Sequence, residues 1–502
     1  MPVAKNLPVL IIAPTETTGI AGYTSRELQR MFRAQLNGDL PACRPAAALS
    51  SAAADVIVLG TPGTNEALRG LLREGFLPAP AQAQGYTLRC APHPRHPHRW
   101  LLAIAGADPA GALYAVRDLE HYHLAAFHPA DGRLTAEPFA REDYPRIAHR
   151  GHWVWGCNMP DKPAWIEQMS RWKLNELIHW DNFPPAKARE YVAFAHERGV
   201  RVSWGFGWGW VPAWNYALPA DFDHGVGDGV EMCGSNPANL QFFRREILRK
   251  VREVYAPTGC DGIYFQAFTE CPKCRCPRCA DRTMGELMLE FVNPIVDAVK
   301  REFPSLWISC GIHHDFGDFS YLKQLDPRCN IYWENCEAGT SVRGENEDFG
   351  YLYKSIPYGH GYSADCPADP PYTEASLQAW MAANAQQYVI PGGRDTHIQY
   401  LTFLQQWTRR FLGKRSGNTH AGVVADHAVF CRRTPFPFVA LAEAQWNPDG
   451  DADAIVDGLL AYLGIRDTVL QTPDPDIPLR DMGGKPPWLC ADTASAREGH
   501  AE

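Results

Sequence analysis

The stretch DGIYFQAFTECPKCRC, residues 261–276, begins as an apolar strand and continues into a carboxylate and several cysteines. Glu270 is the carboxylate that follows the apolar run. An apolar strand and neighbouring aromatic rings disfavour the charged form of a carboxyl group and raise its pKa. A carboxyl that keeps its proton near neutral pH can act as a general acid. We therefore predict that Glu270 donates a proton in catalysis.

Acidic and aromatic residues also occur at the ends of the other predicted strands. Trp beside carboxylates is typical of a sugar site, because the C–H faces of a pyranose pack on indole rings while carboxylates and Arg bond the hydroxyls. Glycoside hydrolysis needs a protonated carboxyl and a second group that attacks or activates water. We assign the second role to Glu334 or Glu337. The predicted sugar-binding residues are Arg150, Trp153, Trp180, Asp181, Trp208, His314 and Asp426.

Structural roles compete with several of these assignments. The acidic candidates other than Glu270 could equally form structural ion pairs, and His314 could be a buried structural histidine. The segment WGFGWGW, residues 204–210, has glycine at every second position, which leaves that face open to close approach of a ligand. For Trp208 we therefore favour a substrate platform over plain core packing.

Four cysteines close to Glu270 have the spacing C-x2-C-x-C-x2-C: Cys271, Cys274, Cys276 and Cys279. Paired CxxC knuckles are typical of structural zinc sites, but a longer loop normally separates the two knuckles. A further cysteine could therefore complete the site: Cys310, Cys336 or Cys366. We expect a structural zinc beside Glu270. We expect no cofactor for catalysis, since no open His-rich site is visible.

Strand and helix patterns alternate along most of the chain and predict the α/β class. Residues 1–140 have the pattern of a small α/β domain. Residues 145–435 alternate with the period of a (β/α)8 barrel, or TIM barrel, and residues 436–502 read as a helical C-terminal extension and tail. The predicted barrel strands are 146–155, 174–181, 201–208, 262–268, 306–312, 330–336, 387–393 and 421–428. Active sites of such barrels form at the carboxyl ends of the strands.

Composition excludes several classes of partner. The net charge is −9, so no polybasic face favours nucleic acid or an anionic membrane. No apolar run reaches the roughly 18 residues that a membrane helix needs, and no secretory cleavage signal follows the N-terminal apolar run. We therefore expect a cytoplasmic protein whose fifteen cysteines are reduced thiols or metal ligands. An oligosaccharide is the expected partner, and a homo-oligomer remains open.

Several segments resemble a group of glycoside hydrolases. IAGADPAGALYAVRDLEH (104–121) resembles the G-x-D-x-x-G-x-x-Y signature of the small domain that precedes the barrel in family 20 β-hexosaminidases and family 67 α-glucuronidases. PRIAHRG (145–151) resembles their first barrel strand, and MSRWKLNELIHWDN (169–182) resembles their K-x-N second strand. QAFTE (266–270) is similar to the strand-4 segment of the α-glucuronidases, whose Glu is the general acid. The resemblance covers roughly residues 1–430 and implies this two-domain order, with Glu270 as acid.

One position departs from the hexosaminidase pattern. Those enzymes have Asp-Glu at the end of strand 4, where the Asp positions the acetamido group of the substrate, whereas this chain has Thr269 before Glu270. We therefore predict an exo-acting glycoside hydrolase of the α-glucuronidase-like kind. The alternatives are a β-N-acetylhexosaminidase-like hydrolase and a carbohydrate-binding barrel without catalysis.

Overall fold

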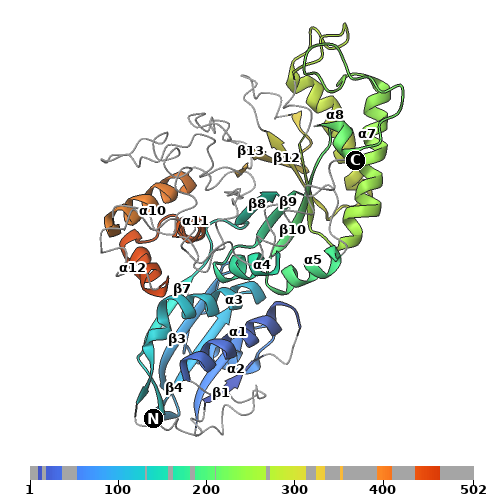
Figure 1. Cartoon of the computed structure of the whole chain (residues 1–502). Helices are drawn as coiled ribbons and strands as arrows, with labels where there is room; N and C mark the ends of the chain where they lie inside the picture. Colours follow the sequence, from blue (N-terminus) through green and yellow to red (C-terminus); the bar gives the residue numbers. More distant parts are fainter. Residues whose placement is uncertain are drawn as a thin grey trace.

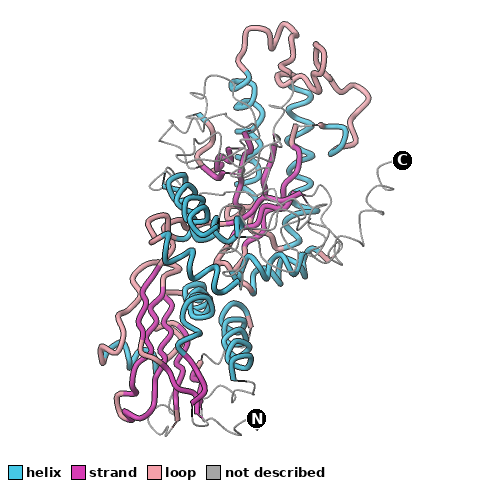
Figure 2. Tube along the Cα trace, turned by 60° about the vertical axis from the view of Figure 1, so that its left-hand side comes forward, coloured by secondary structure: helices cyan, strands magenta, loops and turns pink. Residues whose placement is uncertain are grey.

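A computed structural model describes the chain over twelve ranges. They are residues 9–13, 18–36, 54–130, 133–155, 162–180, 187–209, 211–266, 272–312, 324–333, 351–353, 393–409 and 436–463. Figure 1 shows the N-terminal α/β domain at one end of the molecule and a second, parallel sheet beyond it. Figure 2 shows the same two groups of strands from another side. Within the described ranges, every helix is too short or too polar to cross a bilayer.

The N-terminal domain contains one five-stranded sheet in the order β1-β2-β4-β3-β7. Strands β1, β2 and β4 are parallel, whereas β3 runs antiparallel to both β4 and β7. Apolar side chains of α1 and α3 pack with one set of strand residues, and those of α2 pack with the other. The strands are Val9–Ile12 (β1), Asp55–Gly60 (β2), Tyr86–His93 (β3), His96–Gly106 (β4) and Phe139–Asp143 (β7); the helices are Gly19–Leu36 (α1), Glu66–Arg73 (α2) and Pro109–Asp118 (α3). A short hairpin, Phe127–Ala130 (β5) with Arg133–Ala136 (β6), completes the domain.

The signature around Asp108 builds the start of α3. The Asp108 carboxylate caps the helix by accepting a hydrogen bond from the Gly111 backbone N–H at 2.8 Å, and it also accepts one from the Gln84 N–H at 2.7 Å. A Cβ at Gly111 would lie 2.2 Å from the Gly85 carbonyl oxygen, so only glycine allows this close packing. The signature therefore joins α3 to the loop before β3.

The second sheet contains seven parallel strands in the order β14-β13-β12-β11-β10-β9-β8. They are Gly151–Trp155 (β8), Glu176–Trp180 (β9), Arg201–Gly207 (β10), Gly262–Gln266 (β11), Trp307–Ile312 (β12), Cys329–Trp333 (β13) and Tyr351–Tyr353 (β14). Six of them fall at predicted strands, while β14 lies where no strand was predicted. The predicted strand at 421–428 and residues 387–392 of the one at 387–393 are outside the described residues, while Gly393 begins a helix. Consecutive parallel strands with helical crossovers form the first part of a barrel-type topology.

Helices cover one face of this sheet, and the register shows which strand residues face them. Val202, Trp204 and Phe206 of β10 belong to the same apolar cluster as α5 and α7. Their neighbours Ser203, Gly205 and Gly207 alternate onto the opposite face. The helices are Lys162–Arg171 (α4), Ala188–Glu197 (α5), Pro212–Asn215 (α6), Pro237–Lys250 (α7) with a π-helical turn Val251–Tyr255, and Met284–Glu302 (α8). Figure 1 shows α7 and α8 side by side.

Three C-terminal helices pack together, and at least two of them contact the N-terminal domain. They are Gly393–Arg409 (α10), Phe436–Trp446 (α11) and Ala452–Leu463 (α12). Trp446, the last residue of α11, is buried in the apolar cluster of the N-terminal domain. Its indole N–H donates to Asp143 at 3.1 Å, and Asp143 ends β7. The interval between the two predicted domains, residues 140–145, thus belongs partly to an edge strand held by a distant helix.

Candidate functional site

Arg150 lies at the amino-terminal edge of the second sheet, directly before β8, and its side chain is fully buried. Its guanidinium donates to the Lys173, Ile147 and Ala148 carbonyls and to Gln84 Oε1. The same group lies over the rings of Tyr114 and Trp446. The prediction that Arg150 binds sugar is therefore wrong. The residue joins the sheet to the N-terminal domain, at the end opposite to the strand ends where substrate is expected.

Lys173 and Asn175, the K-x-N pair, belong to the same junction. Lys173 has a positive φ of 62° and is 1% exposed, with its ammonium 2.9 Å from Asp118 of α3 and 3.3 Å from Glu443 of α11. Asn175 accepts a hydrogen bond from the Arg150 backbone N–H at 2.8 Å. The motif that supports the family resemblance thus connects three parts of the chain.

The two carboxyls that share Lys173 differ in acidity. Burial favours the neutral form of Asp118, but Lys173 and Arg141 outweigh burial and lower its pKa to about 2. For Glu443 burial dominates over Lys173 and raises the pKa. One ammonium between two buried carboxyls therefore holds Asp118 as the anion and leaves Glu443 the easier group to protonate.

Other ionisable residues gather at the same amino-terminal edge. Arg201 at the start of β10 lies 3.6 Å from Glu176 at the start of β9 and 3.8 Å from Asp261. Asp261 also pairs with His196 at 2.7 Å. Polar groups at this edge of a barrel-type sheet serve stability, since catalysis takes place at the other edge. These pairs are therefore not candidates for the active site.

Trp208 follows the end of β10 but is fully buried in the apolar cluster between sheet and helices. Its ring stacks on Phe265 with centroids 3.7 Å apart and an interplanar angle of 14°. Because the side chain has no exposed surface, it offers no platform for a sugar. The prediction that Trp208 binds substrate is wrong, and the aromatic residues at 204, 206 and 208 are core. The glycines between them alternate onto the opposite face of the strand, where they too are buried.

At the carboxyl edge, the backbone register groups two of the predicted aromatic positions. Trp153 pairs with Ile178, which pairs with Ser203. Trp180 pairs with Gly205, which in turn pairs with Tyr264. By backbone register, position 153 is therefore aligned with Ser203, and position 180 with Gly205, of β10. The remaining predicted residues lie outside the described part of the chain: Glu270, Glu334, Glu337, Asp181, His314 and Asp426.

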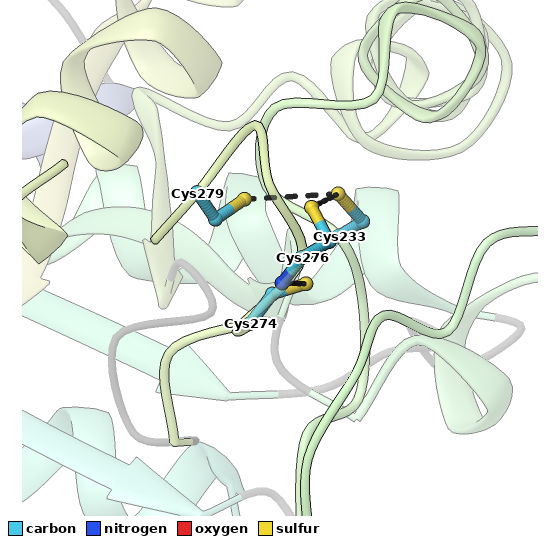
Figure 3. A group of neighbouring side chains, drawn as sticks. All are labelled: Cys233, Cys274, Cys276 and Cys279. Carbon is cyan, nitrogen blue, oxygen red and sulfur yellow. Dashed lines mark hydrogen bonds between the residues drawn. The ribbon is translucent and has the colours of Figure 1, made fainter. Parts of the chain in front are cut away.

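Three of the predicted metal ligands come together with a cysteine that the sequence did not indicate. Cys274, Cys276 and Cys279 group with Cys233, and their sulfur atoms all lie within 4.8 Å of one another (Figure 3). Cys271 lies outside the described residues. Among the further cysteines considered, Cys310 is buried in the apolar cluster on β12 rather than in this group, and Cys336 and Cys366 are not described. Cys233 comes from the loop after β10, 41 residues before Cys274, so spacing alone gave no signal for it.

Comparison with solved structures finds similar folds at low sequence identity. A chitobiase of Flavobacterium johnsoniae has a TM-score of 0.56 and 13% identity, covering 94% of this chain and 71% of its own. A β-N-acetylhexosaminidase of family 20 from Streptomyces coelicolor has a TM-score of 0.53 and 14% identity, covering 91% and 92%. A mutant Streptomyces plicatus β-hexosaminidase in complex with the product GlcNAc has a TM-score of 0.52 and 13% identity, covering 91% of each chain.

Sequence comparison adds no relative: no family model matches the chain, and no curated protein does. The structural likeness shows the fold of the family 20 glycoside hydrolases, an N-terminal domain followed by a barrel-type domain. The family 20 side of the predicted resemblance is thereby supported, and the family 67 side gains no support from these structures.

Proposed function

We propose that the chain is an exo-acting glycoside hydrolase with a (β/α)8 barrel and Glu270 as general acid. The observation that carries the proposal is the parallel sheet, because the carboxyl ends of all its strands meet at one edge. Glu270 comes four residues after the end of β11, and Asp181 and Glu334 each come directly after a strand, β9 and β13. In this proposal Glu334 or Glu337 is the second catalytic group, and Trp153, Trp180, Asp181, His314 and Asp426 hold the sugar.

A β-N-acetylhexosaminidase-like activity is the better supported choice of substrate class. Each of the three structures compared above is a chitobiase or β-hexosaminidase. Thr269 stands where those enzymes have an Asp, so we propose that the acetamido group, if it takes part, is positioned without that carboxylate. The α-glucuronidase activity and a purely sugar-binding barrel become the alternatives that the experiment separates.

The test is a panel of aryl glycosides that includes N-acetylglucosaminides, N-acetylgalactosaminides and uronides, assayed with the parent and with Glu270→Gln. We expect cleavage of the N-acetylhexosaminides and a loss of about 10²–10⁴ in kcat/KM in the variant. The loss in kcat/KM should be greatest for glycosides whose aglycone is a poor leaving group, because departure of such an aglycone depends most on protonation of its oxygen. Glu253→Gln is the matched control, since Glu253 is half exposed and pairs with Arg249 on the helix surface.

Three results would speak against parts of the proposal. Cleavage of uronides alone would favour the α-glucuronidase alternative. Sugar binding by calorimetry without turnover would favour the binding barrel. Unchanged activity of Glu270→Gln on every substrate would refute its role as the acid.

A further inference from the structure

We propose that Cys233, Cys274, Cys276 and Cys279 bind one structural zinc ion that joins the loop after β10 to the loop after β11. The Cys233 sulfur lies 3.7 Å from the sulfurs of both Cys276 and Cys279. A tetrahedral zinc with Zn–S bonds of about 2.3 Å separates its sulfur ligands by about 3.8 Å. These two distances already match a four-thiolate site, and every pair of the four sulfurs lies within 4.8 Å.

A disulfide or simple apolar packing fits the geometry of these cysteines less well than a metal site does. A disulfide needs sulfur atoms about 2.05 Å apart, far closer than the 3.7 Å observed here. A buried free thiol often packs simply as a small apolar group, and Cys233, Cys274 and Cys279 are indeed buried. Apolar packing, however, does not account for the convergence of four sulfurs from two separate loops on one point (Figure 3).

Hydrogen-bond donors surround the sulfur atoms, as the outer groups of a thiolate metal site do. The Val226 backbone N–H donates to the Cys274 sulfur at 3.3 Å, and the Ser235 hydroxyl lies 3.0 Å from the Cys279 sulfur. Arg278 donates to the Cys233 sulfur at 3.6 Å. Four thiolates and one Zn²⁺ carry a net charge of −2, which these donors, and Arg278 above all, help to offset.

The loop after β10 is shaped to approach the cysteines closely. Gly225 has a φ of +83°, and a Cβ there would lie 2.7 Å from Val230 and 3.1 Å from the Cys274 sulfur. Asp223 connects the two loops by accepting a hydrogen bond from Arg278 at 2.9 Å. Among the described residues, α6 is the one helix in this loop, so a metal ion would supply the stabilisation that regular structure does not.

The zinc content of the purified full-length chain tests the proposal. We expect one zinc per wild-type chain, measured by plasma mass spectrometry after dialysis. In Cys233→Ser we expect the zinc content per chain to fall roughly tenfold or more. Cys260→Ser is the matched control, because Cys260 lies outside the group and donates to the Tyr255 carbonyl. Cys271→Ser separates this ligand set from the one that spacing alone suggests, and it should keep its zinc.

A second measurement covers the case in which Cys233→Ser does not fold. Wild-type protein reloaded with cobalt(II) should show the absorption bands of tetrahedral cobalt bound by four thiolates. The proposal is overturned by wild-type protein without stoichiometric metal, by iron in place of zinc, by a Cys233→Ser protein that keeps its zinc, or by a disulfide among these cysteines in alkylated protein. Metal content is independent of glycosidase activity, so this result and that of the Glu270 test are separate.

Discussion

Replacing Lys173 by Met should weaken the junction between the two sheets and the C-terminal helices. The ammonium is 1% exposed and lies 2.9 Å from Asp118, which is equally buried. Removing one partner of a buried pair leaves an uncompensated charge and costs about 3–5 kcal/mol. Asp118 keeps a second cation, because Arg141 Nε lies 3.4 Å away, so we expect a value near the lower end of that range.

Thermal unfolding measures this loss directly. An unfolding entropy of about 2.1 cal/mol/K per residue gives about 1 kcal/mol/K for a chain of 502 residues that unfolds as one unit, so 3 kcal/mol lowers Tm by about 3 °C. The matched control is Lys187→Met, because Lys187 is exposed and its loss should change stability by less than about 0.5 kcal/mol.

A double-mutant cycle tests the assigned cause. In Lys173→Met/Asp118→Asn no charge remains unpaired between these two positions. The double variant should therefore be more stable than the sum of the single losses predicts, by about 0.5–3 kcal/mol. Additive losses, or a Lys173→Met protein as stable as the Lys187→Met control, would refute the role of Lys173 as the buried counterion of the junction.

Three further changes test other parts of the fold. Glu443 has a raised pKa because it is buried. Between the unfolded pKa of about 4.5 and the higher folded pKa, the folded state therefore keeps a proton that the unfolded chain has released. Wild-type Tm should fall as pH rises through this interval, and that slope should vanish in Glu443→Gln. Trp446→Ala removes a fully buried ring and should cost about 3–5 kcal/mol in thermal unfolding, and a loss below 1 kcal/mol would contradict its placement in the core. Asp108→Ala removes the cap of α3 and should cost about 1–2 kcal/mol, while Asp108→Asn should restore most of it.

The local pattern of the sequence predicted most of the second sheet. Strands β8 to β13 are short apolar runs between amphipathic helices, and each run carries its own signal because a strand buried on both faces is apolar throughout. The alternation in WGFGWGW also gave the two faces of β10 correctly. It did not tell which face the helices cover, since periodicity has no information on what lies opposite. The helices cover the aromatic face, and Trp208 is therefore part of the core.

Contacts between distant segments were beyond local pattern. Arg150 was assigned to a strand end because the predicted strand began at residue 146, whereas β8 begins at Gly151 and Arg150 precedes it. Cys233 was missed because 41 residues separate it from Cys274, and only the parallel pairing of β10 with β11 brings the two following loops together. The first error concerns the boundary of a strand, which sequence pattern locates poorly, and the second concerns which strands pair, which local pattern does not reveal.

The residues that carry the family resemblance have structural roles, and this affects what the resemblance can imply. Asp108 caps α3, Lys173 is a counterion between three parts of the chain, and Asn175 fixes the backbone before β8. Such contacts fix the arrangement of the two domains, and the fold is shared with structures of 13–14% identity. They say nothing about the reaction. We predict the chemistry at the opposite edge of the sheet, so the Glu270→Gln variant, and not a substitution at the junction, separates a hydrolase from a barrel that only binds sugar.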